Sequence, residues 1–121
     1  MNDKLLPKEL REKLPYLNSI RHLRYDEMCV QAKYSVEMMV DNVPTSWIWY
    51  ILEGEEQVDG DWLFWGFRIK NETDFEEFTL QALIGLSISW NTKLKLDINH
   101  KNKALSAVFE KMGIKWHPGD W

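Results

Sequence analysis

The chain has 121 residues, 45% of them hydrophobic, and a formal net charge of −4 at pH 7. This size suits one core, so we predict a single domain over residues 1–121. The lone cysteine, Cys29, excludes an internal disulfide and favours a reducing, cytoplasmic location. Charged residues and Pro7 near the start are atypical of a secretory signal, and no apolar run approaches bilayer length. We therefore expect neither export nor a membrane span.

Residues 5–15 predict a short amphipathic helix that ends at Pro15, because Leu6, Leu10 and Leu14 recur every four residues. Residues 28–40 partly alternate between apolar and polar side chains. This pattern predicts a half-buried strand. Its apolar face is formed by Met28, Val30, Ala32 and Tyr34.

Residues 41–46 are rich in turn-forming types and predict a loop. Two aromatic-rich runs, 47–52 and 62–69, predict a hairpin whose connection, residues 53–61, is strongly acidic. Strand alternation places Trp47 and Trp49 on one face and gives Trp62 and Trp65 opposite parity.

Residues 78–85 predict the end of a strand followed by a helix, with Thr79 as its cap and Gly85 as its stop. Residues 93–98 alternate and predict a strand that turns Leu94, Leu96 and Ile98 inward. The pattern over residues 103–112 predicts a final helix. Its signals are Asn102 as N-cap, apolar Leu105, Val108, Phe109 and Met112, and Gly113 at the end.

These elements predict an α+β fold, a small antiparallel β-sheet with short N-terminal and C-terminal helices packed on it. The segments LLPKELREKLPYL, SWIWYILEGE, VDGDWLFWGFRI and EEFTLQALIGL also resemble a known family of small proteins, domain-of-unknown-function family 2958. Members are typically carried by plasmids, conjugative elements and phages. The resemblance implies an accessory protein of a mobile element and carries no catalytic residues.

Charge is distributed unevenly along the chain. Residues 1–24 hold six basic and three acidic side chains, residues 25–77 three and thirteen, and residues 78–121 six and three. An acidic centre disfavours phosphate binding there and suits a basic protein partner. The candidate partner-binding residues are Glu53, Glu55, Glu56, Asp59, Asp61, Trp49, Trp62 and Trp65. The alternatives for these residues are a solvated turn and buried packing of the indoles.

The sequence has no motif typical of catalysis or of a bound cofactor. His22, His100 and His117 are scattered, and no glycine-rich phosphate loop or nucleophile elbow is present. We therefore predict a protein that is not an enzyme and needs neither metal nor cofactor.

Our leading hypothesis is an interaction protein of a mobile element that binds a protein partner, and a sharper form is an inhibitor of a host defence nuclease. A small-ligand pocket or enzyme site among the tryptophans is one alternative. Weak nucleic-acid binding is another, and a second copy of the chain is a further possible partner. The nucleic-acid alternative depends on Lys4, Lys8, Arg11, Lys13, Arg21 and Arg24.

Overall fold

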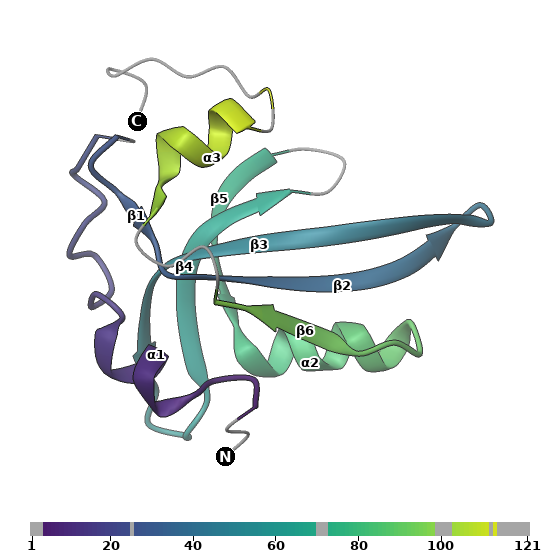
Figure 1. Ribbon diagram of the computed structural model, residues 1–121. Coiled ribbons are helices and arrows are strands. Elements are labelled where there is room, and N and C mark those ends of the chain that lie inside the picture. The colour runs from purple at the N-terminus through teal and green to yellow at the C-terminus, as the bar shows by residue number, and fades with distance from the viewer. Residues whose placement is uncertain (1–3, 25, 70–72, 99–102, 112, 114–121) are drawn as a thin grey trace.

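The computed structural model describes residues 4–24, 26–69, 73–98, 103–111 and 113. Its centre is a five-stranded antiparallel sheet with the order β5-β4-β3-β2-β6 (Figure 1). The strands of this sheet are β2 (Ala32–Val40), β3 (Val43–Glu56), β4 (Trp62–Ile69), β5 (Thr73–Thr79) and β6 (Leu94–Asp97). Two short strands, β1 (Cys29–Val30) and β7 (Lys103–Ala104), pair separately. The helices are α1 (Lys8–Lys13), α2 (Leu80–Ser89) and α3 (Leu105–Lys111). The predicted α+β class is confirmed.

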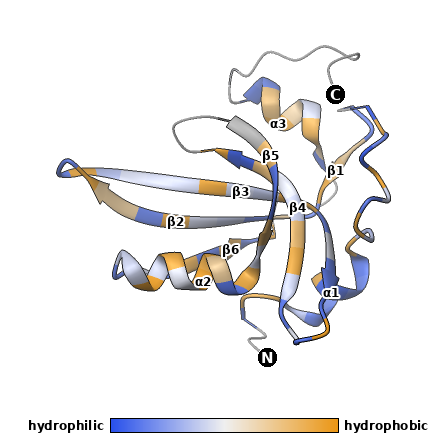
Figure 2. Cartoon of the chain, turned by 180° about the vertical axis from the view of Figure 1, so that it is seen from behind, coloured by the Kyte–Doolittle hydropathy of each residue, from blue (hydrophilic) through white to orange (hydrophobic). Residues whose placement is uncertain are grey.

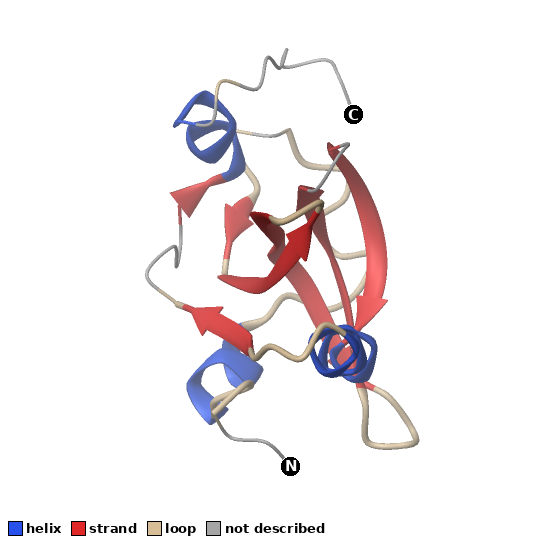
Figure 3. Ribbon diagram, turned by 90° about the vertical axis from the view of Figure 1, so that its right-hand side faces the viewer, coloured by secondary structure: helices blue, strands red, loops and turns tan. Residues whose placement is uncertain are grey.

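Both faces of the sheet carry a hydrophobic core, and different helices cover them. Figures 1 and 3 place α3 on the opposite side of the sheet from α1 and α2. The first core contains Leu6, Leu10, Leu14, Ala32, Tyr34, Val36, Met38, Trp49, Ile51, Trp62, Phe64, Phe78, Leu80, Leu83 and Leu94. The second contains Met28, Val30, Tyr50, Leu52, Phe67, Leu105, Val108 and Phe109. The predicted apolar stripe of the N-terminal helix is therefore confirmed.

A β-bulge changes the phase of β3. Before the bulge Ile51 pairs with Gly66, and after it Glu53 pairs with Trp65, so Leu52 is an extra residue. Leu52 belongs to the second core, and Trp65 packs against the same core. Uninterrupted alternation from Ile51 would send Glu53 to the first core. The bulge instead brings Glu53 to the face of Trp65.

The predicted loop over residues 41–46 is wrong beyond its first two positions. Asp41 and Asn42 have φ angles of 51° and 65° and form a two-residue turn, across which Val40 pairs with Val43. Residues with this conformation are typical of tight hairpins. The strand tolerates Pro44 because β3 pairs only with β2 there, and pairing with β4 begins at Ile48.

Two further boundaries differ from the prediction. The Thr79 hydroxyl caps α2 by accepting from the Ala82 N–H at 3.0 Å, as predicted, but Gly85 lies inside the helix and does not stop it. The helix continues to Ser89, and the chain reverses where Asn91 has a φ of 54°. Ile98 was predicted to face inward, but it follows the end of β6 and is 45% exposed.

The predicted strand over residues 28–40 is broken at Gln31, whose N–H donates to the Ile51 carbonyl at 2.9 Å. Because of this break, Met28 and Val30 join the second core while Ala32 and Tyr34 join the first. The prediction of one shared face is therefore wrong. The final helix is confirmed from Leu105, later than predicted, since β7 occupies the preceding residues. Asn102 and Met112 lie outside the described residues.

Two glycines provide a matched test of the bulge. A Cβ atom on Gly66 would stand 1.9 Å from the Tyr50 carbonyl oxygen, whereas one on Gly85 would meet no atom within 4 Å. Gly66→Ala should lower the free energy of unfolding by at least about 2 kcal/mol, because the backbone of β3 at Tyr50 or of β4 at Gly66 must shift to relieve the clash. Gly85→Ala should raise it by about 0.5–1 kcal/mol through helix propensity. Urea denaturation of both variants measures this, and equal effects would contradict the bulge geometry.

Tyr34 is fully buried in the first core and donates its hydroxyl hydrogen to the Leu5 carbonyl, joining β2 to the N-terminal segment. Burial raises the pKa of Tyr34 above its ordinary value of 10.0. As the pH rises, the unfolded chain therefore loses this proton at a lower pH than the folded chain does. The stability provided by the buried, protonated hydroxyl is lost as the pH rises above about 10. Tyr34→Phe should cost about 1–3 kcal/mol at neutral pH.

The same variant should lose less stability than the wild type when the pH is raised above about 10. Urea denaturation at two pH values checks both effects. Tyr16→Phe is the control, because Tyr16 is 74% exposed and its replacement should leave the curves unchanged. Identical behaviour of the Tyr34 and Tyr16 variants would refute the assigned bond.

Candidate functional site

The side chain of Glu53 is buried and is surrounded by the segment that follows α1. One carboxylate oxygen, Oε1, accepts from the Asn18 N–H at 2.8 Å and from Arg21 Nε at 2.9 Å. The other, Oε2, accepts from the Ile20 N–H at 2.9 Å. Glu53 has 0% relative exposure, so this carboxylate depends on those donors for its stabilisation. Its predicted place in a solvated acidic tip is wrong.

Arg21 extends this buried network toward β4 and β5. Its guanidinium lies 4.8 Å from the centre of the Trp65 ring, and its Nη2 lies 3.2 Å from the Glu77 carboxylate. Trp65 is itself stacked on Phe75, with ring centres 5.0 Å apart. A guanidinium can bind a carboxylate and an aromatic face at the same time. Arg21 therefore attaches the N-terminal segment to three strands.

A second set of contacts is made by the next two residues of β3, Gly54 and Glu55. The Glu55 carboxylate accepts from the Leu17 N–H at 3.0 Å, and the Gly54 N–H donates to the Pro15 carbonyl at 3.0 Å. A Cβ atom on Gly54 would approach Phe64 and Leu14 to 2.8 and 3.0 Å, so the side-chain-free position permits this close packing. The two segments are held against each other over several residues.

An open groove of about 820 Å³ lies where these two segments meet. One wall comes from α1 and the residues after it, including Glu12, Pro15 and Tyr16, and the other comes from the ends of β3 and β4. The acidic residues that line it are Glu12, Glu55 and Glu56, with Arg11 as a basic residue. Trp62 reaches the groove with only a small part of its surface, because it is 8% exposed. We call this the acidic groove.

Only part of the predicted site meets at this groove. Glu55, Glu56 and Trp62 line it. The Asp61 carboxylate instead accepts from the N–H groups of Trp62 and Gln81, at 2.8 and 3.2 Å, and Asp59 accepts from the Asp61 N–H at 3.0 Å. These two aspartates therefore shape the turn between β3 and β4.

Two of the three tryptophans among the candidate partner-binding residues are buried, which agrees with the alternative of buried packing. Trp49 and Trp62 are buried in the first core at 4% and 8% exposure, and the Trp49 indole N–H donates to Glu76 at 3.2 Å. Trp65 packs on the other face, which confirms the predicted opposite parity of Trp62 and Trp65. Trp47 and Trp49 share a face, as predicted, with ring centres 6.4 Å apart.

At least three of the six basic N-terminal residues are ion-paired with carboxylates. Arg21 is paired with Glu53 and Glu77, Arg24 with Asp26 at 3.0 Å, and Lys8 with Glu12 at 3.8 Å. A phosphate-binding surface needs uncompensated cations on one face. These ion pairs reduce the charge that the predicted nucleic-acid surface could offer.

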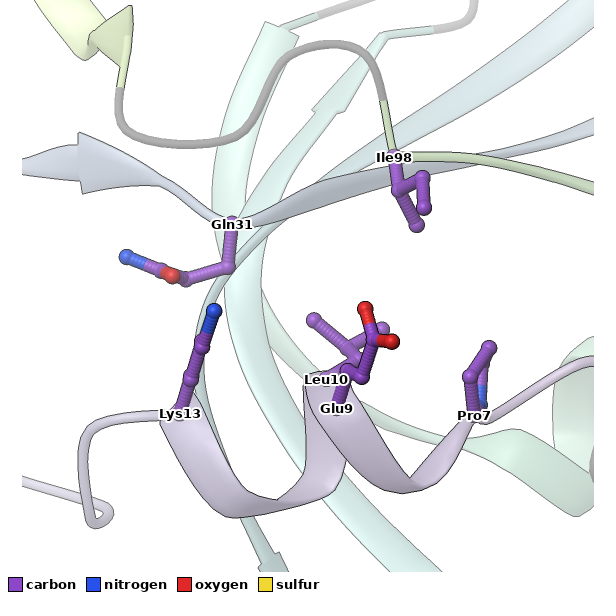
Figure 4. A pocket seen from close by; sticks show the side chains of 6 residues that line it. All are labelled: Pro7, Glu9, Leu10, Lys13, Gln31 and Ile98. Atoms are coloured by element: carbon purple, nitrogen blue, oxygen red, sulfur yellow. The ribbon is translucent and has the colours of Figure 1, made fainter.

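A second, smaller cavity lies between α1 and the region where β2 and β6 approach it. Figure 4 shows Glu9, Leu10 and Lys13 of α1 on one side of it and Gln31 and Ile98 on the other. Its volume is about 30 Å³, which is close to the space of one water molecule. It is too small for an organic ligand.

The far end of the β2–β3 hairpin carries exposed apolar side chains, and Figure 2 shows hydrophobic colour at that end of β2. Met39, Val40 and Val43 are 55%, 41% and 59% exposed. Nothing in the described part of the chain covers them.

Among the described residues, no three His, Cys, Asp or Glu side chains are grouped as metal ligands would be. Within the same residues, no helix has the length and apolar character needed to cross a bilayer. The chain gave no significant match to a family model, to a curated protein or to a solved structure. Kinship with family 2958 remains a prediction, and function must be argued from the site itself.

Arg21, Pro15 and Tyr16 belong to the site region, but the sequence interpretation did not place them beside the acidic residues: it assigned Arg21 to a nucleic-acid surface and Pro15 to the end of a helix. Arg21 and Glu53 are 32 residues apart, and no short motif links them. The one available signal was the shortness of the N-terminal helix. A helix of about two turns is marginal alone, so it has to pack on the rest of the protein and bring the following residues with it.

Glu53→Gln should lower the free energy of unfolding by about 3 kcal/mol, because it removes the charge that compensates Arg21 and places an amide donor near backbone donors. Urea denaturation measures the change. Glu56→Gln is the matched control, since Glu56 is exposed on the same strand and should leave the unfolding curve unchanged. A loss below about 1 kcal/mol for Glu53→Gln would contradict a central role for this carboxylate.

Proposed function

We propose that this protein is a non-catalytic interaction protein that binds a basic segment of a protein partner in the acidic groove. The observation that carries the proposal is the meeting of Glu12, Glu55 and Glu56 with exposed Tyr16 in one open groove. Carboxylates steer a positively charged partner, and aromatic surface provides contact area once it is bound.

The groove is well suited to recognition because its walls are already held in place. Glu53 and Glu55 bind the backbone of residues 17–20, so the N-terminal wall needs little further ordering when a partner arrives. A preformed site loses less conformational entropy on binding than a mobile one. An open shape also suits an extended peptide better than a small molecule that must be enclosed.

We extend the proposal to an accessory role in a mobile genetic element and, in particular, to inhibition of a host defence nuclease. The resemblance to family 2958 supports the first part, and the acidic groove supports the second. Nucleases that bind nucleic acid present basic surfaces, which an acidic protein can occupy. Several predicted acidic residues are engaged internally, so recognition at the groove is favoured over imitation of nucleic acid along the whole hairpin.

The proposal is tested by charge reversal in the groove. Glu12→Lys combined with Glu56→Lys changes two exposed rim residues that take no part in the buried Glu53 network. Glu37→Lys combined with Glu110→Lys is the control, because it changes the net charge equally at exposed positions elsewhere. Each protein is titrated with a fluorescently labelled lysine- and arginine-rich peptide at low and moderate salt, and is also used as bait in a host-cell lysate.

The groove variant should bind the peptide at least about tenfold more weakly, and the loss should be greatest at low salt. A nuclease captured by wild type and control, but lost by the groove variant, would then be assayed for inhibition. Equal peptide binding by all three proteins, or none by the wild type, would reject the acidic groove as the site.

A further inference from the structure

A basic pocket lies on the other face of the sheet, beneath α3. It has a volume of about 560 Å³, and three lysines from separate elements line it: Lys33 of β2, Lys103 of β7 and Lys111 at the end of α3. This volume falls within the range of small-molecule sites, roughly 300–1,000 Å³. We call it the lysine pocket. It shares no lining residue with the acidic groove.

The floor of the lysine pocket is determined by strand register. Lys33 pairs with Tyr50 of β3 on one side and with Asp97 of β6 on the other, so the three side chains form a row across the sheet. Lys33 Nζ lies 3.8 Å from the Asp97 carboxylate, which limits how far this ammonium group can move. The row provides one positioned cation with an aromatic ring beside it.

Tyr50 contributes a group that stays protonated. Its side chain is 4% exposed, and burial raises the pKa of its hydroxyl above the ordinary value, with a smaller contribution from the charge of Asp97. A neutral hydroxyl places no negative charge in a site lined by lysines. Because Lys33 and Asp97 are paired beside it, the floor adds no net charge, and the positive charge of the pocket comes from Lys103 and Lys111.

The wall formed by α3 leaves space because its side chains are small. Ala107, Val108 and Lys111 of α3 line the pocket together with Ala104 at the end of β7, and two of these four residues are alanine. Lys111 stands at the C-terminal end of α3, and Lys103 precedes it in β7. The helix thus contributes both the empty space and a cation at its edge.

The charges of the lysine pocket are not balanced within the described residues. Asp97 is ion-paired with Lys33, but no carboxylate in that part of the chain lies in ion-pair contact with Lys103 or Lys111, both of which are exposed. Like charges that converge on one cavity repel one another unless an anion is bound between them. Lys103 and Lys111 line the same cavity, with Lys33 on its floor, and three lysines in one lining suit an anion with more than one negative charge.

We propose that the lysine pocket binds a small compound that carries a phosphate or pyrophosphate group, whose anionic oxygens Lys33, Lys103 and Lys111 contact. Ammonium groups are common phosphate-binding groups in proteins. The apolar wall of Ala107 and Val108 is placed to contact an organic part of the ligand. Its volume lies in the range of small-molecule sites, which favours a small molecule over a nucleic-acid strand.

Isothermal titration calorimetry of the full chain tests the proposal, with inorganic pyrophosphate and adenosine triphosphate as probes at low salt. The test variant is Lys103→Gln combined with Lys111→Gln, which removes two cations at exposed positions and should leave the fold intact. The control is Lys8→Gln combined with Lys93→Gln, which removes the same charge at exposed positions outside the pocket. Ala107→Glu is a third variant, which places a negative charge on the pocket wall.

Saturable binding by the wild type and the control, weakened by about tenfold or more in the test variant and in Ala107→Glu, is the expected result. Tighter binding of adenosine triphosphate than of pyrophosphate would identify a nucleotide-like ligand, and equal binding would identify the phosphate group alone as the ligand. Absence of saturable binding by the wild type, or equal loss in test and control variants, would overturn the proposal. A short single-stranded oligonucleotide that binds while both phosphate probes fail would also overturn it, in favour of a nucleic-acid surface.

Discussion

The buried carboxylate of Glu53 is the interaction on which the arrangement of this protein depends. A charged group with no solvent exposure is costly unless donors surround it, and the donors here come from the N-terminal segment. Arg21 then carries the connection to Trp65 and Glu77. One carboxylate therefore secures a segment more than thirty residues away and, with it, one wall of the acidic groove.

The buried position of Glu53 shows that the acidic residues at the centre of the chain are not simply a solvated surface. A run of carboxylates between two aromatic strands looks like a solvated surface, yet Glu53, Glu55, Glu76 and Asp61 accept hydrogen bonds within the protein. These four carboxylates stabilise the fold by accepting hydrogen bonds from backbone and indole N–H groups. Glu12 and Glu56 are exposed where they line the groove, and the proposed recognition of a basic segment depends on them.

The two candidate sites have opposite charge and lie on opposite faces of one sheet. The acidic groove uses the N-terminal segment and the β3–β4 hairpin, whereas the lysine pocket uses α3 and the face of β2 and β3 that α3 covers. The bulge at Leu52 underlies this separation, because it assigns Leu52 and Glu53 to the α3 face while Gly54 packs against Leu14 and Phe64. Because the two proposed sites share no lining residue, a macromolecule in one would not compete directly with a small anion in the other.

Local patterns in the sequence determined the elements with a strong period: the leucine stripe of α1, the two aromatic strands, the Thr79 cap and the apolar face of α3. These depend on contacts between near neighbours, which spacing reveals. Only the tertiary structure decided where Glu53 lies, since one extra residue in β3 reverses every later side chain. It also decided that Met28 and Ala32 belong to different cores, and that Lys33 meets Lys103 and Lys111. These placements depend on strand register and on packing between residues that are far apart in the chain, which local patterns do not encode.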